Sequence, residues 1–213
     1  MADWDHSVDL VVVGSGAAAM AAGIRAKDLG QNVLLVEKSD AYGGSSAMSG
    51  GVCWVGNNPF MKKYGIADSD EEVLTYLEHI TAGEVPREYL RTYVTESKRM
   101  TEYFAEKTRL TFDALDKYTD YYPEAPGGKM GGRSMEPDPF DASLLGDDFN
   151  QLQKPATSAL ILGRMMISAR DAKRFIMLDF IAFVMLAWMM VRYAFRFAKR
   201  SRYKGRDTFI TNG

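Results

Sequence analysis

Residues 8–19 read VDLVVVGSGAAA, in which a mostly apolar run leads directly into a Gly-Ser-Gly turn. The β-branched run predicts a buried strand, and the alanines after the turn predict the start of a helix. Gly14 permits the tight turn, and Gly16, which has no β-carbon, lets a phosphate approach the backbone. Ala19 holds the third position of this fingerprint, where close packing of helix on strand is the requirement. The stretch therefore predicts a helix whose N-terminus faces a pyrophosphate.

A second apolar run, VLLV at residues 33–36, ends at Glu37. A carboxylate about twenty residues beyond the glycine turn typically accepts hydrogen bonds from ribose hydroxyls, and it disfavours a 2′-phosphate. The pair of strands and the acid thus predict an adenine dinucleotide other than NADP.

Residues 42–51 read YGGSSAMSGG and continue into the apolar run VCWV at residues 52–55. Glycines and serines let a loop pass close to a flat ligand while donating N–H and O–H groups. A flexible surface loop is the alternative, but a loop that leads straight into a predicted strand favours a fixed path. Because a nicotinamide domain would begin another strand–helix unit here, we predict FAD. The predicted cofactor contacts are Gly14, Ser15, Gly16, Ala17, Ala18, Glu37, Lys38, Gly43, Gly44, Ser45, Ser46, Ser49, Gly50 and Gly51.

The run GGSSAMSGGVCW at residues 43–54 resembles the flavoprotein family of fumarate reductases and 3-ketosteroid dehydrogenases. Two further patches, DYYPE at residues 120–124 and GGRSMEP at residues 131–137, are most similar to the 3-ketosteroid 1-dehydrogenase branch. The resemblance extends to about residue 145.

The resemblance implies an FAD-dependent oxidoreductase that takes a steroid-like cyclic ketone and passes electrons to an external acceptor. In that branch a hydride leaves C1 of the ketosteroid for flavin N5, and a tyrosine removes a proton from C2. Tyr121 matches a second tyrosine that supports this base; the alternative is an aromatic packed beside Tyr118 and Tyr122. Arg133 is expected to pair with Glu136 and shape its loop.

The principal base and the groups that polarise the keto oxygen come later in the family chain than residue 213. We therefore expect this chain to be a fragment or a truncated product of a longer protein. Two other functions stay open: reduction of a C=C bond, as in fumarate reductases, and a non-catalytic flavin-binding or membrane-associated piece. Membrane-bound succinate dehydrogenases attach FAD through a histidine beside the glycine loop. Neither His6 nor His79 lies there, so non-covalent FAD is expected.

The predicted fold class is α/β, with an incomplete Rossmann-like FAD-binding domain followed by a mostly helical substrate or cap region. We predict three segments: the FAD-binding segment 1–58, helices and a substrate-side loop at 59–157, and the start of a cap or catalytic domain at 158–213. Ser69 predicts a helix start, with the helix reaching residue 82, and Pro86 predicts the first turn of a helix to about Lys107. Residues 118–157, rich in proline and glycine, are expected to form a long functional loop.

Charge and cysteine content narrow the partners. The 213 residues carry 26 Lys and Arg against 28 Asp and Glu, which disfavours a nucleic-acid binder. The lone Cys53 cannot form an internal disulfide, and the acidic N-terminus does not resemble a signal peptide, so a cytoplasmic location is expected. The spacing of Cys and His predicts no metal site.

Residues 175–195 read FIMLDFIAFVMLAWMMVRYAF, with basic residues on both sides. The run is long enough to span a bilayer, but Asp179 and Arg192 interrupt it. Three readings stay open: a buried helix of the substrate domain, a helix or hairpin lying on a membrane surface through residues 173–206, and a true span. Since steroids partition into membranes, the second reading would place substrate entry at the lipid surface.

Overall fold

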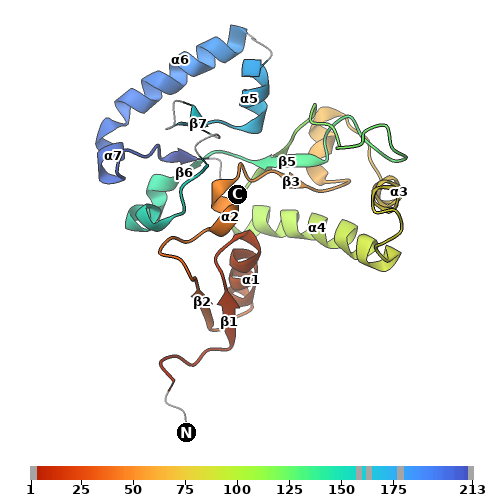
Figure 1. Ribbon diagram of the computed structural model, residues 1–213, viewed down its shortest axis with the longest axis horizontal. Coiled ribbons are helices and arrows are strands. Elements are labelled where there is room, and N and C mark those ends of the chain that lie inside the picture. Colours follow the sequence, from red (N-terminus) through yellow and green to blue (C-terminus); the bar gives the residue numbers. More distant parts are fainter. Residues whose placement is uncertain (1–3, 157–159, 162–164, 177–179, 211–213) are drawn as a thin grey trace. The chain divides into compact units, whose positions relative to one another are not determined.

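The structure, a computed structural model, describes residues 4–156, 160–161, 165–176 and 180–210 (Figure 1). The chain divides into two compact units. The first unit comprises residues 1–51, 140–167 and 174–213, and the second comprises residues 52–139 and 168–173. The three segments that the sequence predicts stay a prediction.

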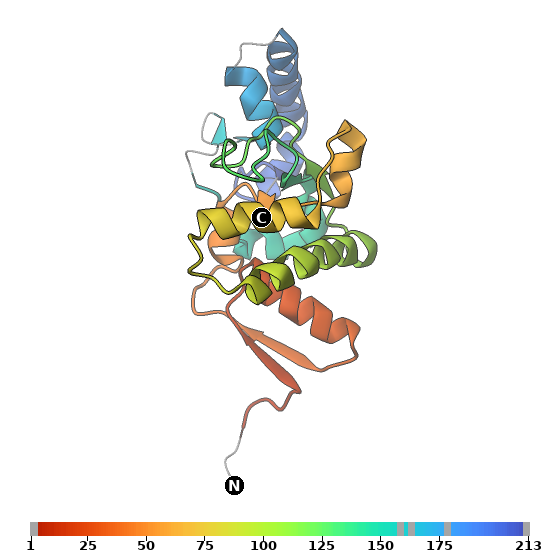
Figure 2. The ribbon, with the colours of Figure 1, turned by 90° about the vertical axis from the view of Figure 1, so that its right-hand side faces the viewer.

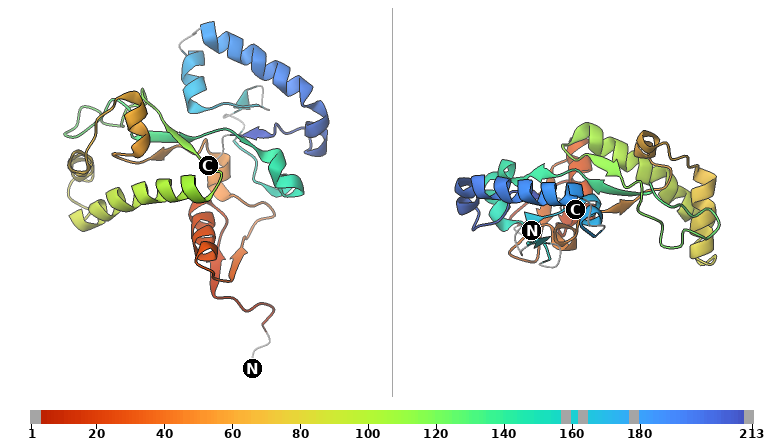
Figure 3. Two further views of the ribbon diagram at one scale, coloured as in Figure 1. Left: turned by 180° about the vertical axis from the view of Figure 1, so that it is seen from behind. Right: turned by 90° about the horizontal axis from the view of Figure 1, so that it is seen from above.

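The first unit opens with a strand–helix–strand motif. Strand β1 (Leu10–Val13) leads into helix α1 (Ala17–Asp28), and strand β2 (Val33–Val36) returns parallel to β1 (Figure 3). Leu10 lies opposite Val33, and Val13 lies opposite Val36. Two parallel strands need a crossover connection, and α1 supplies it. The strand, the turn, the helix and the second strand are therefore where the sequence predicts them.

The prediction that β1 is a buried strand is wrong for the described part of the chain. Val12 is buried, but the neighbouring Val13 is 82% exposed. Parallel strands become buried when neighbours and helices cover both faces. Within the described residues, β1 pairs with β2 alone, so much of its apolar surface faces solvent.

The second glycine segment contains a short helix, α2 (Gly44–Met48), where the sequence predicts a loop throughout. Its N-cap, Gly43, has φ +105°, a conformation that residues with a β-carbon rarely adopt. A β-carbon on Gly43 would also lie 2.6 Å from the β-carbon of Ala47. Gly43 thus allows the chain to turn into α2 and lets the buried Ala47 pack against the turn.

The rest of the first unit surrounds a small core. It contains strand β6 (Phe140–Asp141), the 3-10 helix η2 (Ala142–Gln151), strands β7 (Leu160–Ile161) and β8 (Met165–Met166), helices α6 (Phe180–Phe195) and α7 (Phe197–Arg202), and strand β9 (Phe209–Ile210). Strand β6 pairs with β9, and β7 pairs with β8, both antiparallel. Phe149 and Tyr203 pack edge to face in the core. A β-bridge between Tyr42 and Leu152 fastens the second glycine segment to the end of η2.

The second unit combines a sheet with two helices. Strand β5 (Ser134–Pro137) lies between β3 (Cys53–Trp54) and β4 (Phe112–Ala114), antiparallel to both. The 3-10 helix η1 (Pro59–Tyr64) follows β3. Helices α3 (Asp70–Ile80) and α4 (Arg87–Lys107) pack together through Val73, Leu74, Leu90 and Val94 (Figure 2).

Both helix starts that the sequence predicts in the second unit are confirmed. The Ser69 hydroxyl accepts a hydrogen bond from the backbone N–H of Glu72 at 3.2 Å, which makes Ser69 the N-cap of α3. Pro86 is the N-cap of α4, which ends at Lys107.

The prediction of a loop over residues 118–157 is partly wrong. The stretch contains β5, β6 and η2. Strand β5 was missed because its sequence, SMEP, carries a charge and a proline and lacks a β-branched run. It forms because β3 and β4, from distant parts of the chain, supply hydrogen-bonding partners on both edges.

The apolar segment near the end of the chain is not one described helix. Helix α5 (Ala169–Ile176) precedes α6, and residues 177–179, with Asp179, lie outside the described residues. Among the helices that are described, none combines the length and the apolar character needed to cross a bilayer.

Candidate functional site

The two glycine segments of the first unit are joined directly. The Ser15 hydroxyl accepts a hydrogen bond from the Gly43 N–H at 2.9 Å, and the Ser46 hydroxyl accepts one from the Ala17 N–H at 3.0 Å. A β-carbon on Gly44 would lie 3.4 Å from the Gly16 α-carbon, so the two backbones are close. The second glycine segment therefore lies directly against the first.

The first turn of α1 offers backbone donors without competition from its own side chains. Gly16 is the N-cap, with extended backbone at φ −70° and ψ 175°, and no acidic residue lies in the first turn. The first N–H groups of a helix have no partner within the helix, so those of Ala18 and Ala19 are free of helical bonds. Gly14 has φ +99°, and a β-carbon there would meet nothing within 4 Å. Open space, exposed donors and the positive end of the helix dipole together fit a pyrophosphate.

Glu37, directly after β2, is the acidic residue of the predicted site. Its carboxylate accepts hydrogen bonds from the Ser15 hydroxyl and, at 3.0 Å, from the Ser39 N–H. The Ser15 hydrogen bond, followed by that from Ser39, holds the pKa of Glu37 below its ordinary value. An ionised carboxylate has about four lone-pair sites, so acceptor capacity remains for ribose hydroxyls.

Ser15 has a role that the sequence does not reveal. Its side chain is buried and joins Glu37 to the N–H of Gly43. The hydroxyl thus ties the acid to both glycine segments, and any direct contact of Ser15 with a ligand is through its backbone. The sequence shows that Ser15 lies between Gly14 and Gly16, but it does not show that the side chain points towards Glu37 and Gly43.

The remaining predicted contacts lie on the outer part of the second segment and after β2. Lys38 and Ser45 are exposed. The Ser49 hydroxyl donates to the Ser46 carbonyl at 2.8 Å and accepts from the Gly51 N–H at 3.1 Å, which turns the chain towards Gly50 and Gly51. The structure gathers all fourteen predicted residues in the first unit. Their contacts with a cofactor stay predictions.

Tyr121 belongs to the second unit, and its side chain is 91% exposed. It is therefore free to meet a ligand. It does not pack as a core aromatic beside Tyr118 and Tyr122, which are themselves exposed.

The predicted pairing of Arg133 with Glu136 is wrong. Arg133 binds Asp68 through Nε and Nη2, both at 2.8 Å, and binds Asp120 through Nη1 at 2.9 Å. Glu136 accepts a hydrogen bond from the Ala169 N–H at 2.7 Å, and burial raises the pKa of its carboxyl group. The alternation of a strand explains this, since Arg133 and Glu136 stand three positions apart and point to opposite faces.

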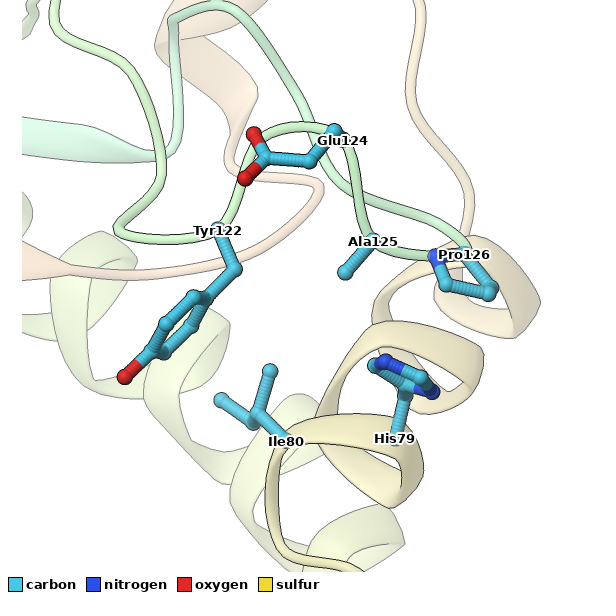
Figure 4. A pocket seen from close by; sticks show the side chains of 6 residues that line it. All are labelled: His79, Ile80, Tyr122, Glu124, Ala125 and Pro126. Carbon is cyan, nitrogen blue, oxygen red and sulfur yellow. The ribbon is translucent and has the colours of Figure 1, made fainter.

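A cleft of about 390 Å³ lies in the second unit, between the end of α3 and the loop after Tyr121 (Figure 4). Its lining is His79, Ile80, Tyr122, Glu124, Ala125 and Pro126. None of these residues belongs to the predicted cofactor set. His79 is exposed.

The chain is similar to several known proteins. The sequence model of the FAD-binding domain family matches residues 9–193. A 3-oxosteroid 1-dehydrogenase of Mycolicibacterium smegmatis is 44% identical over 147 residues, which are 69% of this chain and 26% of that protein. A 3-oxosteroid 1-dehydrogenase of Comamonas testosteroni is 33% identical over 210 residues, 98% of this chain and 36% of that protein.

A solved structure is also similar. The crystal structure of 3-ketosteroid Δ1-dehydrogenase from Sterolibacterium denitrificans, in complex with 1,4-androstadiene-3,17-dione, matches with a TM-score of 0.88 and 40% identity. The match covers 96% of this chain and 36% of that chain. This chain thus spans between 26% and 36% of the length of these relatives.

Proposed function

The chain belongs to the FAD-binding domain family, its cofactor is FAD, and we propose that it forms part of an FAD-dependent dehydrogenase of 3-ketosteroids or similar cyclic ketones. The observation that carries the proposal is the direct joining of the two glycine segments through Ser15 and Ser46. One segment offers the start of α1 to the phosphates, and the other supplies small residues beside it. In this proposal the part of the chain that contains both glycine segments is a Rossmann-like FAD-binding unit, and the residues after β3 contribute to a substrate or cap region.

Two of the predicted contacts have roles that follow from their chemistry. The N–H group of Ala18 would donate to the pyrophosphate, as would that of Ala19, which is not among the predicted contacts, and the ionised Glu37 would accept hydrogen bonds from the ribose hydroxyls. When bound, FAD supplies an acceptor for a hydride. No histidine belongs to the glycine segments, which supports non-covalent attachment.

The substrate class is supported by the relatives and by Tyr121. The match with the 3-oxosteroid 1-dehydrogenase of Comamonas testosteroni covers 98% of this chain, including both glycine segments and the region of Tyr121. Removing a proton beside a ketone needs a base near the carbon and donors at the carbonyl oxygen. The exposed phenol of Tyr121 can support the base.

Arg133 disfavours the competing function, reduction of a dicarboxylate. A fumarate-type enzyme binds its substrate carboxylates through arginines, and Arg133 is the candidate in the matching region. Its guanidinium is 0% exposed and is held by Asp68 and Asp120. A residue that is inaccessible and already paired with two carboxylates is poorly placed to bind a substrate dicarboxylate.

The proposed activity is tested on the full-length protein with 3-ketosteroids and an artificial electron acceptor, beside fumarate with reduced viologen. We expect a yellow protein whose flavin band bleaches anaerobically on addition of a 3-ketosteroid. Acid precipitation should release the flavin into the supernatant. Turnover of fumarate without bleaching by any ketosteroid would favour the reductase instead.

A second proposal concerns the apolar face of α6, which we infer lies on a lipid surface. The side chains of Phe180, Phe183, Val184, Trp188 and Phe195 are exposed. Single exposed apolar residues are ordinary, but a continuous exposed row along one helix marks an interaction surface. The exposed row on the described residues of α6 supports an interaction surface there.

The arginines at the C-terminal end of α6 form ion pairs with aspartates of the first unit, and further basic residues flank the apolar face of α6 in the sequence. Arg192, the charged residue within α6, lies 3.5 Å from Asp207, and Arg196 pairs with Asp141. Residues 168–210 carry ten lysines and arginines against three aspartates. An apolar helix face within a net basic segment is typical of a helix that lies in the interface of an anionic membrane.

We predict that the full-length protein pellets with vesicles of mixed phosphatidylcholine and phosphatidylglycerol, and that F183E and W188E each weaken binding by about tenfold or more. Burying one large apolar side chain contributes about 1.5–3 kcal/mol, and the glutamates add repulsion from the anionic lipid. High salt should weaken binding in part, because basic residues near the surface contribute about 1 kcal/mol each.

The matched control is L144E, since Leu144 is an exposed apolar residue of the same unit outside α6. It should leave vesicle binding unchanged. If the protein fails to bind vesicles at any salt concentration, another part of the polypeptide covers the α6 face and the proposal is wrong.

A further inference from the structure

The second unit contains an ion network with no access to solvent. Arg133 binds both oxygens of Asp68 and one oxygen of Asp120, and all three side chains are nearly inaccessible. The guanidinium carbon lies 5.6 Å from the ring centre of Trp54 and 5.5 Å from that of Tyr76. Each of the three guanidinium nitrogens therefore donates to a carboxylate, and the stacked rings of Trp54 and Tyr76 lie beside the guanidinium within the unit.

The network fixes the backbone on both sides of Tyr121. Asp120 accepts hydrogen bonds from the Trp54 indole N–H at 2.7 Å and from the Lys129 N–H at 2.9 Å, besides that from Arg133. On the other side, the Tyr122 N–H donates to the Tyr76 hydroxyl at 3.3 Å. Tyr121, between these two held residues, is 91% exposed.

The same network includes Trp54 of strand β3. Trp54 stands three residues after Gly51. Its ring stacks on Tyr76 at 5.9 Å and on Tyr93 at 6.3 Å, and its carbonyl accepts from the Tyr93 hydroxyl at 2.6 Å. The strand that leaves the cofactor segment and the loop that carries Tyr121 are thus held by one set of side chains.

We propose that Asp120 and Tyr76, held by Arg133, are positioning residues that fix Tyr121 for the reaction. The inference rests on the proposed function. A ring that is almost wholly exposed adds little to the packing of the core, so core stability does not require its backbone to be held on both sides. Precise placement of a reacting group does require it, since a misplacement of about 1 Å can cost about 100-fold in rate.

The test is a double-mutant cycle on the full-length enzyme with a 3-ketosteroid. Y121F should lower kcat, and Y76F, which removes the partner of the Tyr122 N–H, should lower kcat by about three- to tenfold with little change in KM. In the Y121F background, Y76F should have almost no further effect, because its influence passes through Tyr121. Y89F is the control, since Tyr89 is an exposed tyrosine of α4, and it should leave kcat unchanged. Additive losses from Y76F and Y121F would overturn the proposal.

A second readout does not depend on activity. Chymotrypsin cleaves after exposed aromatic residues, but it needs a backbone that can leave its place. The peptide bond after Tyr121 should resist cleavage in the natural protein. It should be cut several-fold faster in Y76F and in D120N, because the amide NH2 group of D120N replaces one hydrogen-bond-accepting oxygen of Asp120. If both variants resist as the natural protein does, the loop is held by other means and the proposal fails. Failure of the proposed steroid activity would appear separately, as absence of flavin bleaching in the natural protein.

Discussion

The G16D variant should fold as stably as the natural protein and lose its flavin. Gly16 is the N-cap of α1, where aspartate is among the preferred residues and should stabilise the helix by about a few tenths of a kcal/mol. A β-carbon there would lie 3.6 Å from the Ser46 hydroxyl, an ordinary contact. The new carboxylate would, however, occupy the donors meant for the pyrophosphate and repel it. At about 4 Å and an effective dielectric constant of about 20, the repulsion is about 4 kcal/mol, or about a thousandfold in affinity.

Thermal unfolding and flavin titration of the same samples check this prediction. G16N caps the helix without a charge and should weaken flavin binding less than G16D. G23A changes a glycine inside α1, where a β-carbon would lie 4.0 Å from Val33, and it should keep the flavin. A G16D protein that purifies with a full complement of flavin would show that the start of α1 does not face the phosphates.

The R133M variant should be destabilised by about 3–5 kcal/mol near neutral pH. Methionine fills much of the space of the arginine stem, but Asp120 would be left buried without its cation, and Asp68 would keep only the Lys129 ammonium at 3.9 Å. Chemical denaturation measures the loss. R99M is the matched control, because Arg99 pairs with Glu96 on the exposed surface of α4 and such pairs contribute about 0–1 kcal/mol.

The pH dependence of the R133M effect has a definite sign. In the natural protein, burial acts to raise the pKa of Asp68, but hydrogen bonds from Arg133 and from backbone N–H groups outweigh it and hold the pKa below its ordinary value. This contribution to stability is present above the ordinary aspartate pKa of 3.8 and is lost as the pH falls through the lowered value. Without Arg133, its hydrogen bonds and charge no longer lower the pKa, so the pKa of Asp68 in the folded variant lies above that in the natural protein. The deficit of R133M should therefore shrink as the pH falls from 7 through the ordinary aspartate pKa of 3.8, and a deficit that is constant over this range would contradict this explanation.

Local features of the sequence predict the cofactor-binding part well. The β1–α1–β2 order and the place of Glu37 follow from apolar runs and a glycine turn, which are set by neighbours along the chain. The Ser69 cap and the Pro86 start are local for the same reason.

What the sequence did not predict depends on residues far apart in the chain. Arg133 meets Asp68 across 65 positions, and no periodicity relates the two. Strand β5 has a weak local preference and forms because two distant strands pair with it. The short helix α2 was missed because glycine and serine favour turns, whereas the packing of Ala47 against Gly43 decides the outcome.

The apolar segment shows a different limit. Its composition predicts burial in something apolar, but composition alone does not say whether protein or lipid covers it. The direction in which Arg192 and Arg196 turn, towards Asp207 and Asp141, shows which face of α6 is left exposed.

The most direct measurement is the anaerobic absorbance spectrum of the purified full-length protein, taken before and after addition of a 3-ketosteroid. The account predicts a flavin band at the outset, since both glycine segments are assembled around the start of α1, and bleaching of that band by the steroid. A colourless protein that takes up no added FAD would contradict the proposed cofactor site, and a yellow protein that no cyclic ketone bleaches would contradict the proposed chemistry.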